Sequence, residues 1–592
     1  MMQQVPERTV PVLIVGGGGS GLTASIALSD LGVESLLVER HPSTSPHPKA
    51  HILNGRTMEV FGQLGMADEI YREAAPPETS AAMVWLTSLG GDEPYDRKVL
   101  HRVDAYGGGH LADRYAAASA YRHANLGQRW LEPLLRRQAE KRNPGGVRFH
   151  HELVTFEQDD GGVTALLRDR DSGLEYHVRA LFLIGADGGK TVGRIARIAM
   201  LGTPTFLEWI NLHVRSDFSG FLPHDDAVVN RVSSLTDDGR FEHCGVVPMG
   251  PSRWGRHAEE WTLMFARPPQ AAHLSDEEVV ALVRRTLKLP AAHPMQVYAV
   301  NRWPVEGTVA ASFRRGRVFL AGDAAHRHPP SGGLGLNTGV QDAHNLAWKL
   351  AAVLRGTAGE GLLDSYEAER RPVAEAVVER AMYSVFNQIA ITNGTGVTAA
   401  GSPEWNRAQL TALFADTLAG RARRMLLKEY FDTNRITTEH LGLEIGYDYA
   451  GTPAVLPDGT APPAPDPLRL EYVATARPGH RLPHAWLTHE GTRIGTHDLV
   501  QPGEFLAIGA DEWLDACIAA AGRLGVPLAA HAIGPGGDLQ DPDGTWARLR
   551  GHGEDGVVLV RPDGFVAARR AGRAEDPDAW CEIALRTALA RP

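Results

Sequence analysis

Near the N-terminus, the hydrophobic pattern predicts a strand, a helix and a second strand, with glycines at the first junction. Val10–Val15 is a largely apolar run, as expected for a buried parallel strand. Leu22–Leu31 has apolar residues at helical spacing, and Gly32 is a natural helix end. Ser35–Glu39 is a second short apolar strand that ends in a carboxylate. This order predicts a β-α-β unit whose first turn is the glycine run Gly16–Gly21.

A second strand, loop and helix pattern spans residues 317–354. Val318–Ala321 reads as a buried strand, Asp323 follows it, and a Pro/Gly-rich loop leads into an amphipathic helix. Thr338 with Gln341 predicts a capping box at the start of that helix. A helix start offers free backbone N–H groups and partial positive charge to a ligand. We interpret that ligand as a flavin.

The rest of the pattern predicts how the chain divides. Residues 149–187 alternate like antiparallel strands, and residues 206–300 are mostly β-like, as a sheet covering a substrate would be. Residues 451–468 are rich in Pro and Gly and are the predicted domain boundary. We therefore predict the α/β fold class, with a discontinuous dinucleotide-binding domain (residues 1–85, 111–200 and 301–395), an interleaved β-sheet domain (86–110 and 201–300), a helical linker (396–468) and a C-terminal domain (469–592).

The glycine run carries a dinucleotide-binding pattern. Gly16, Gly18 and Gly21 satisfy GxGxxG, and Glu39 stands where an acid would accept the ribose hydroxyls of an adenosine. The alternative is a glycine turn that only packs a helix on a strand. The order of strand, turn, helix and acidic end favours dinucleotide binding, although this half alone does not separate FAD from NAD.

Composition and charge exclude several classes of protein. The chain has 592 residues, too many for one core, with 43% hydrophobic and 22% charged residues. The formal charge of −11, without a Lys/Arg block, argues against a nucleic-acid or membrane-surface partner. We find neither an apolar stretch of about 18 residues nor a secretory signal. Three separated cysteines fit a cytoplasmic protein and argue against disulfides.

Three separated motifs resemble the class A FAD-dependent aromatic hydroxylases, the family of the 4-hydroxybenzoate and phenol hydroxylases. They are GGGGSG with Glu39 and Arg40, the GADGG turn around Asp187, and GDAAHRHPPSGGLGLNTGVQDAHNLAWKL from Gly322 onward. Residues 48–61, PKAHILNGRTMEVF, look most like the 2,4-dichlorophenol 6-monooxygenase branch. The resemblance implies a Rossmann-like FAD-binding domain, an interleaved β-rich substrate domain and a thioredoxin-like C-terminal domain that lacks redox cysteines.

The resemblance also implies roles for single residues. Asp323 would bind the ribityl chain, Gln128 the same chain or the pyrophosphate, and Lys49 the pyrophosphate, although a solvated surface lysine is an equal alternative. Asp187 would serve both FAD and NADPH, and Pro329 would face the flavin. The expected cofactor-binding set is Gly16, Gly18, Ser20, Gly21, Glu39, Arg40, Lys49, Gln128, Asp187, Asp323, Pro329 and the backbone of Gly335, Leu336 and Asn337.

His51 is the candidate catalytic base. It follows Lys49 and Ala50, where the phenol hydroxylase pattern carries an ionisable residue near the substrate hydroxyl. A phenol attacks far better as phenolate, so a base or relay is expected. The alternative is a histidine bonded within the flavin loop. His326 and His328 alternate like metal ligands, but no further ligand is spaced to complete a set, so we predict no metal.

The predicted function is hydroxylation of an electron-rich aromatic, such as a phenol, chlorophenol or hydroxypyridine. The resemblance implies FAD, NADPH or NADH as co-substrate, O₂, a flavin C4a-hydroperoxide and a homo-oligomer. One alternative is a tailoring hydroxylase of a polycyclic natural product, or an antibiotic-modifying monooxygenase. Another class, a flavoprotein reductase or halogenase, is disfavoured because Trp303-Pro304 does not match the WxWxIP segment of halogenases.

Overall fold

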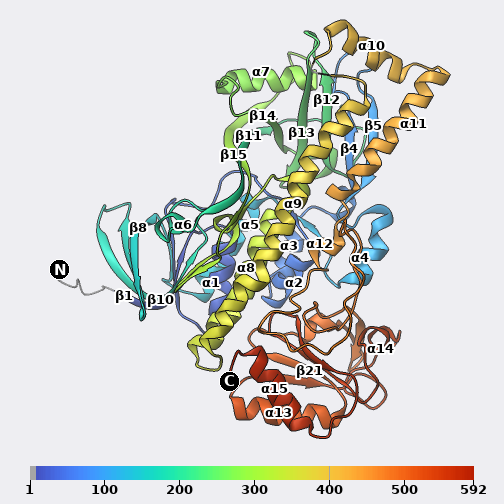
Figure 1. The fold of residues 1–592 in the computed structure, drawn as a ribbon. Helices are drawn as coiled ribbons and strands as arrows, with labels where there is room; N and C mark the ends of the chain where they lie inside the picture. The colour runs from blue at the N-terminus through green and yellow to red at the C-terminus, as the bar shows by residue number, and fades with distance from the viewer. Residues whose placement is uncertain (1–7, 399) are drawn as a thin grey trace.

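The computed structural model describes residues 8–398 and 400–592, and residues 389–391 by backbone alone. Residues 1–7 of the first predicted domain and residue 399 of the predicted linker lie outside it. Two large sheets occupy the upper and middle parts of Figure 1, and a smaller C-terminal unit, in orange and red, lies below. Within the described ranges, no helix is both long and apolar enough to cross a membrane.

The first sheet contains the predicted β-α-β unit. Its strand order is β16-β17-β10-β1-β2-β7, and the pairs of β1 with β10, β1 with β2, β10 with β17 and β2 with β7 are parallel. Helix α1 is buried over most of its length. The mixed α/β class is confirmed. The elements are β1 (Arg8–Val15), α1 (Gly19–Asp30), β2 (Ser35–Glu39), β7 (Val147–Phe149), β8 (His151–Asp159), β9 (Gly162–Asp169), β10 (Glu175–Gly185), α6 (Val192–Ile195), β16 (Arg314–Arg315) and β17 (Val318–Leu320).

The second sheet is mainly antiparallel and lies above the first in Figure 1. Its order is β18-β15-β11-β14-β13-β12-β4-β5, so two strands that precede residue 105 meet six strands that follow residue 199. Alternate residues of each strand face opposite sides of a sheet, so one side chain in two can face a ligand. Its elements are β4 (Ala82–Leu86), β5 (Val99–Asp104), β11 (Met200–Arg215), β12 (Ala227–Leu235), β13 (Phe241–Gly250), β14 (Glu260–Arg267), α7 (Asp276–Leu287), β15 (Gln296–Ala310) and β18 (His326–Arg327).

Smaller elements connect the two sheets. The strands β3 (Ile52–Leu53) and β6 (Ala124–Asn125) pair with each other and bring the loop around His51 against the start of the helix α5 (Gln128–Arg142). Backbone bonds Gln128 N to Ala50 O (2.7 Å) and Leu126 N to His51 O (2.8 Å) hold this crossing. The remaining helices of this region are α2 (Gly55–Gln63), α3 (Ala67–Glu73) and α4 (Ala112–Ala118).

Helix α8 (Gly335–Leu354) begins three residues before the predicted capping box, which is a correction. Leu334 is the residue before its first turn, and no side chain caps it. The hydroxyl of Thr338 instead donates to the carbonyl of Leu334 at 3.0 Å, and Gln341 donates to Thr57. The helix therefore starts without a side-chain cap, and its first N–H groups remain available.

The long helix α9 (Asp364–Gly394) runs alongside both sheets (Figure 1). Helices α10 (Pro403–Phe414) and α11 (Leu418–Asp432) then pack on β4 and β12 through an apolar cluster that includes Trp85, Leu413 and Phe431. After α12 (Leu441–Glu444), residues 451–468 contain neither helix nor strand. They lead into the C-terminal unit.

The C-terminal unit has a four-stranded sheet in the order β22-β21-β23-β24, with β21 and β22 parallel and the other pairs antiparallel. Helices α13 and α15 pack together and bring two free cysteines side by side. The sulfurs of Cys517 and Cys581, 64 residues apart, are buried and 2.9 Å from each other. The elements are β19 (Trp486–His489), β20 (Thr492–Gly495), β21 (Phe505–Gly509), α13 (Asp511–Leu524), β22 (Leu528–His531), α14 (Thr545–Leu549), β23 (Val557–Val560), β24 (Val566–Arg570) and α15 (Pro577–Ala588).

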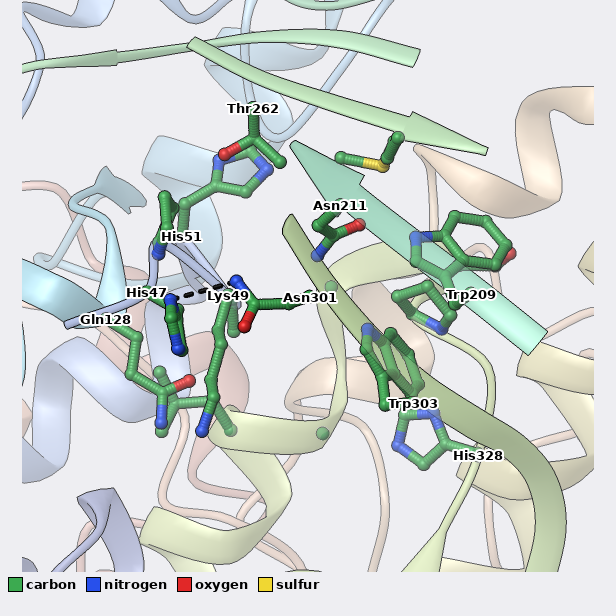
Figure 2. A pocket seen from close by; sticks show the side chains of 18 of the residues that line it. His47, Lys49, His51, Gln128, Trp209, Asn211, Thr262, Asn301, Trp303 and His328 are labelled. Carbon is green, nitrogen blue, oxygen red and sulfur yellow. Dashed lines mark hydrogen bonds between the residues drawn. The ribbon is translucent and has the colours of Figure 1, made fainter. Parts of the chain in front are cut away.

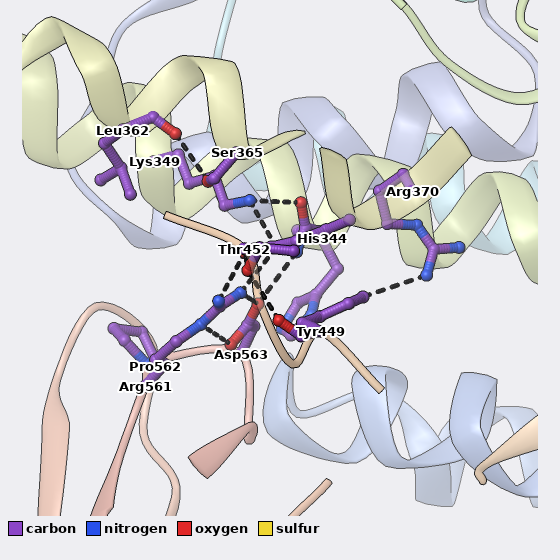
Figure 3. Close-up of polar contacts among 12 residues, drawn as sticks. His344, Lys349, Leu362, Ser365, Arg370, Tyr449, Thr452, Arg561, Pro562 and Asp563 are labelled. Carbon is purple, nitrogen blue, oxygen red and sulfur yellow. Dashed lines mark hydrogen bonds and ion pairs between the residues drawn. The ribbon is translucent and has the colours of Figure 1, made fainter. Parts of the chain in front are cut away.

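A buried ion-pair network joins the C-terminal unit to α8 and α9 (Figure 3). Arg561, in the turn after β23, donates to both oxygens of Glu369 at 2.6 and 2.8 Å. Lys349 of α8 donates to Glu369 at 2.6 Å, and Asp563 accepts from Arg561 and Asn345. Burial lowers the pKa of Lys349 to about 8, partly opposed by Glu369. The charges are fully buried, so removing one partner would leave another uncompensated.

Candidate active site

A single continuous cavity of about 910 Å³ extends from the glycine turn after β1 to the second sheet. Its wall includes Gly16 and Asp323 at one end and Trp85 and Phe431 at the other. Figure 2 shows the middle of this cavity, where His51, Lys49 and Gln128 lie opposite Trp209 and Trp303. A ligand in it would therefore touch both sheets at once.

The glycine turn leaves backbone donors free at the start of α1. Among the described residues, the N–H groups of Gly18, Gly19 and Ser20 have no acceptor. A side chain at Gly21 would collide with the carbonyl of Gly16, so glycine here lets α1 pack closely against the turn. Gly21 does not line the cavity. Free amides at a helix N-terminus suit a pyrophosphate.

Glu39 lies beside that turn. One carboxylate oxygen accepts the N–H of Gly17 and the other the N–H of His41, both at 2.8 Å. These bonds fix the carboxylate while each oxygen keeps a further lone pair. Arg40 is exposed and lines the same part of the cavity. Both side chains therefore border the cavity beside the glycine turn.

Lys49 and Gln128 also line the cavity, and a buried acid accompanies them that we did not predict. Gln128 donates to Glu132 at 2.5 Å, and Glu132 accepts the backbone N–H of Ser45 at 3.0 Å. Burial raises the pKa of Glu132. The sequence could have indicated Glu132, because it lies four residues after Gln128 and therefore on the same face of α5.

The two candidate aspartates differ in how they are used. Asp187 accepts the backbone N–H groups of Gly189, Thr191 and Val192 at 3.1, 2.6 and 2.9 Å, so its carboxylate holds the turn before α6. Asp323 is exposed to the cavity and its carboxylate has no hydrogen-bond partner among the described residues. Of the two, Asp323 is the one free to bind a polyhydroxylated chain.

The start of α8 lies at the centre of the cavity. Within the described part of the chain, the N–H groups of Gly335, Leu336 and Asn337 have no acceptor. A Cβ at Gly335 would lie 3.3 Å from Nε2 of His328, so glycine lets the backbone approach a ligand. The prediction for Pro329 needs correction, because Pro329 is buried and Pro330 lines the wall instead.

His51 faces the cavity with a defined tautomer. Its Nδ1 is 2.8 Å from Oδ1 of Asn125, whose amide nitrogen donates to Ser80 at 3.0 Å. Because Oδ1 can only accept, Nδ1 of His51 carries the proton. Burial lowers the pKa of His51, only partly opposed by Asn125, so the ring is neutral near pH 7. Its Nε2 is then a proton acceptor.

The two histidines after β17 make contacts with the protein itself. Nε2 of His326 is 2.8 Å from Asp342, and both are fully buried. Nδ1 of His328 donates to the carbonyl of Pro329 at 2.7 Å, and burial lowers the pKa of His328 to about 4. Through these hydrogen bonds, His326 and His328 hold the loop after β17 in place.

The opposite wall is aromatic. Trp209 and Trp303 lie on adjacent strands with ring centroids 6.1 Å apart, and Met264 and Trp85 continue the same face of the second sheet. The free helix starts, the unpaired Asp323 and the clearance at Gly335 fit a flavin dinucleotide. The fold and site therefore define a flavin-dependent oxidoreductase whose substrate cavity suits aromatic molecules.

Comparison with known proteins identifies the family. The model of the FAD binding domain matches residues 9–381, and that of the aromatic-ring hydroxylase C-terminal domain matches residues 475–592. The chain belongs to the FAD-dependent aromatic-ring hydroxylases, and it is a flavoprotein monooxygenase. The resemblance inferred from its motifs is confirmed.

Individual relatives cover nearly the whole chain. The 2,4-dichlorophenol 6-monooxygenase of Delftia acidovorans is 35% identical over 571 residues, 94% of each chain. The crystal structure of the flavin-dependent monooxygenase PieE with FAD and substrate is 38% identical, with a TM-score of 0.91 over 99% of this chain and 100% of that one. The complex of aklavinone-11 hydroxylase with FAD and aklavinone is 30% identical, with a TM-score of 0.78 over 100% of both chains.

Proposed function

We propose that this monooxygenase hydroxylates an electron-rich phenol, chlorophenol or hydroxypyridine, with NADPH or NADH as reductant and O₂ as oxygen donor. One observation carries the proposal: the free N–H groups at the start of α8, the acceptor nitrogen of His51 and the aromatic wall of Trp209 and Trp303 line one cavity. Bound FAD supplies hydride acceptance and oxygen activation, which no side chain can supply.

The protein contributes orientation, electrostatics and one proton transfer. The N–H groups of Gly335 and Leu336 favour negative charge on a ligand in front of them without a mobile cation. Asp323 accepts hydroxyl protons of a polyol chain, and Arg40 or Lys49 neutralises phosphate charge. The apolar wall excludes water, which strengthens these interactions.

His51 takes the phenolic proton at Nε2. Its neutral ring, fixed by Asn125, has the lone pair directed away from that partner, and transfer gives an imidazolium that Asn125 Oδ1 stabilises. The aromatic ring becomes more electron-rich as the phenolate forms, which is what attack on an electrophilic oxygen requires. His51 is thus proposed as the base, and Asn125 as the residue that positions it.

The proposal is tested with the purified FAD-loaded enzyme. Bleaching of the flavin by NADPH should accelerate when phenol, 2,4-dichlorophenol or a hydroxypyridine is added, and a hydroxylated product should form in proportion to the NADPH consumed. Stimulated NADPH oxidation that releases only H₂O₂ with every aromatic tested would contradict it.

A second substrate class, a polycyclic natural product, is favoured by the length of the wall. Cavity-lining side chains come from β15, β11, β14, β13, β12 and β4, which span most of the second sheet. Adjacent strands lie about 4.8 Å apart, so the wall is much longer than one benzene ring. Comparing coupled turnover of monocyclic phenols with that of hydroxyanthraquinones separates the two classes.

We further propose that the C-terminal unit is a thioredoxin-like domain with a structural role. Support comes from its β-α-β then β-β-α order with sheet order β22-β21-β23-β24. It has no CxxC pair, so disulfide exchange is not its function. Its deletion should yield aggregated protein without FAD, because the deletion exposes the partners of the buried network around Glu369.

We also propose a cytoplasmic homo-oligomer. Support for self-association comes from exposed apolar side chains on α9 and α11, namely Tyr383, Phe386, Met425, Leu426 and Tyr430. Support for the compartment is the small number of cysteines. Light scattering after gel filtration tests the first proposal, with Met425→Glu expected to lower the measured mass, and cell fractionation tests the second.

A further inference from the structure

The far end of the cavity contains an arginine without a protein partner. Arg231 lies on β12 and lines the cavity. Among the described residues, it forms no ion pair, no hydrogen bond and no stacking contact with an aromatic ring, and its Nε is buried and unpaired. By contrast Arg302, which also lines the cavity, donates to Asp276 at 2.8 Å. An unpaired buried cation is costly, so a ligand that supplies its partner would gain affinity.

The neighbours of Arg231 cannot neutralise it. Across the sheet it pairs with Trp85 of β4 and Gly245 of β13. Tyr106 lies close enough to interact with it electrostatically, but burial raises the pKa of Tyr106 to about 12, so that phenol stays neutral. Burial, together with the charge of Arg231, lowers the pKa of His243 to about 4. Arg231 is therefore the charged group of this end of the cavity.

The acidic residues that line the cavity lie at the other end. In the described part of the wall, they are Glu39, Glu132, Glu152, Asp187 and Asp323, all from the FAD-binding sheet or its connections. The strands of the second sheet contribute apolar, aromatic, amide, hydroxyl, imidazole and arginine side chains to it, and no carboxylate. An anion at Arg231 would thus meet no repulsion from a neighbouring acid.

A glycine stands opposite Arg231 on the neighbouring strand. Gly245 has no side chain, and Met264 of the next strand packs over it, because a Cβ at Gly245 would lie 2.6 Å from Met264. The glycine therefore offers Arg231 no polar partner. A planar guanidinium with free N–H groups can bind two oxygens of one anion side by side.

Strand order places Arg231 away from the flavin end. Asn301 of β15 donates to His47 at 2.9 Å, which ties that strand to the loop of Lys49 and His51 (Figure 2). β12 is four strands from β15 in the order β15-β11-β14-β13-β12. At about 4.8 Å a strand, the two strands lie roughly 19 Å apart. A group bound at Arg231 is therefore remote from β15 and from the contact between Asn301 and His47.

We infer that Arg231 is the specificity-determining residue of this monooxygenase, and that it binds an anionic oxygen group of an aromatic substrate, such as a carboxylate, at the end of the cavity away from β15. This inference rests on the proposed aromatic hydroxylase function. The substrate class it names is an aromatic acid of more than one ring. An uncharged phenol is then a weaker substrate than the matching aromatic acid, because it leaves Arg231 without a partner.

The test compares matched acid and amide probes on the FAD-loaded enzyme. The pairs are benzoate with benzamide, 6-hydroxy-2-naphthoate with its amide, and a hydroxyanthracene carboxylate with its amide. Binding is followed by the change in flavin absorbance, and turnover by NADPH oxidation and product. We expect the naphthoate and anthracene acids to bind about tenfold or more tightly than their amides, as a charge-assisted pair predicts.

Variants then assign the preference to the residue. Arg231→Met should abolish the preference for acids, Arg231→Lys should keep part of it, and both should retain FAD. The control Arg267→Met changes an arginine of β14 that donates to the carbonyl of Ala272 and does not line the cavity, and it should keep the preference. Equal binding of acids and amides by the unchanged enzyme, or a preference that survives in Arg231→Met, would overturn the inference.

The outcomes separate this inference from the proposed function. Aromatics that stimulate NADPH oxidation and are hydroxylated without regard to charge would overturn the inference and leave the function standing. If no aromatic of either charge is hydroxylated, the proposed function fails and the inference fails with it.

Discussion

Asn337 at the start of α8 is hydrogen-bonded to Asn54 in the loop that follows His51. Its Oδ1 accepts the backbone N–H of Asn54 at 2.9 Å, and its Nδ2 donates to the carbonyls of Ile52 and Gly333 at 2.9 and 2.6 Å. One buried amide thus joins the helix proposed to face the flavin to the segment that carries the proposed base. The sequence predicts that the backbone of Asn337 contacts the cofactor. The side chain of Asn337 has a separate role, which is to connect the two segments.

Replacement of Asn337 by Ala should therefore loosen two parts of the site together. The N–H of Asn54 and the carbonyl of Ile52 would be buried without partners, at about 1–3 kcal/mol each. We expect a lower thermal midpoint, faster loss of FAD on dilution and slower substrate-stimulated NADPH oxidation. Asn406→Ala is a matched control, because Asn406 also accepts one N–H and donates to two carbonyls, in α10. FAD loss no greater than in Asn406→Ala would contradict the expectation.

Gly335 gives a steric prediction at the same helix start. A Cβ at this position would lie 3.3 Å from Nε2 of His328, so a branched side chain must displace either the histidine or the ligand in front of the helix. Gly335→Val should reduce flavin content and slow flavin reduction. Gly220→Val is the control, since a Cβ there has no neighbour within 4 Å. Full flavin content and an unchanged reduction rate in Gly335→Val would reject the close approach of flavin to this backbone.

His51 gives a prediction for the dependence of turnover on pH. Its pKa is lowered by burial, so the base form persists as the pH falls below the ordinary histidine value near 6.5. Substrate-stimulated NADPH oxidation should hold down to that lowered pKa and then decrease, and His51→Gln should abolish the acid-side decrease and reduce the rate about 10²-fold. Asn125→Ala should shift the decrease without removing it. A profile in His51→Gln that matches the unchanged enzyme would refute the assignment.

The local parts of this site could be predicted from sequence because their chemistry depends on neighbours in the chain. Each of these parts comes directly after or at the end of a strand that the hydrophobic pattern already predicts. They are the turn of Gly16 to Gly21, the strand end at Glu39 and the carboxylate of Asp323. The start of α8 was predicted wrongly, because the hydroxyl of Thr338 bonds back to the carbonyl of Leu334 inside the helix instead of capping it.

Contacts across long sequence separations account for the other differences. Cys517 and Cys581 meet only because α13 and α15 pack together, which spacing cannot reveal. Arg231 looks like an ordinary strand arginine until the structure shows that no carboxylate of the described residues pairs with it. Pro329 and Pro330 are adjacent in sequence, and only the path of the loop decides which one lines the cavity.

His344 gives a prediction for the dependence of stability on pH. Burial, helped by the charge of Arg56, lowers the pKa of His344 to about 3. The unfolded chain binds a proton below about pH 6.5 that the folded chain does not, so stability is lost as the pH falls, by about 1.4 kcal/mol per pH unit. His344→Gln should flatten the decrease in the unfolding midpoint between about pH 7 and about pH 5. His489→Gln, at the exposed end of β19, should leave it unchanged; equal slopes in both variants would contradict the argument.

Arg561 tests whether the C-terminal unit depends on the buried network of Figure 3. Arg561→Met leaves Glu369 and Asp563 buried with Lys349 as their remaining cation, and breaking such a pair costs about 3–5 kcal/mol. The first unfolding transition should move to lower temperature, and limited proteolysis should cut within residues 451–468. Arg561→Met with Glu369→Leu should recover part of the loss, because it removes the stranded charge. The control Arg548→Met changes an arginine whose contacts are exposed, and should shift stability by less than about 0.5 kcal/mol. An unfolding midpoint in Arg561→Met equal to that of this control would show that the network does not hold the unit in place.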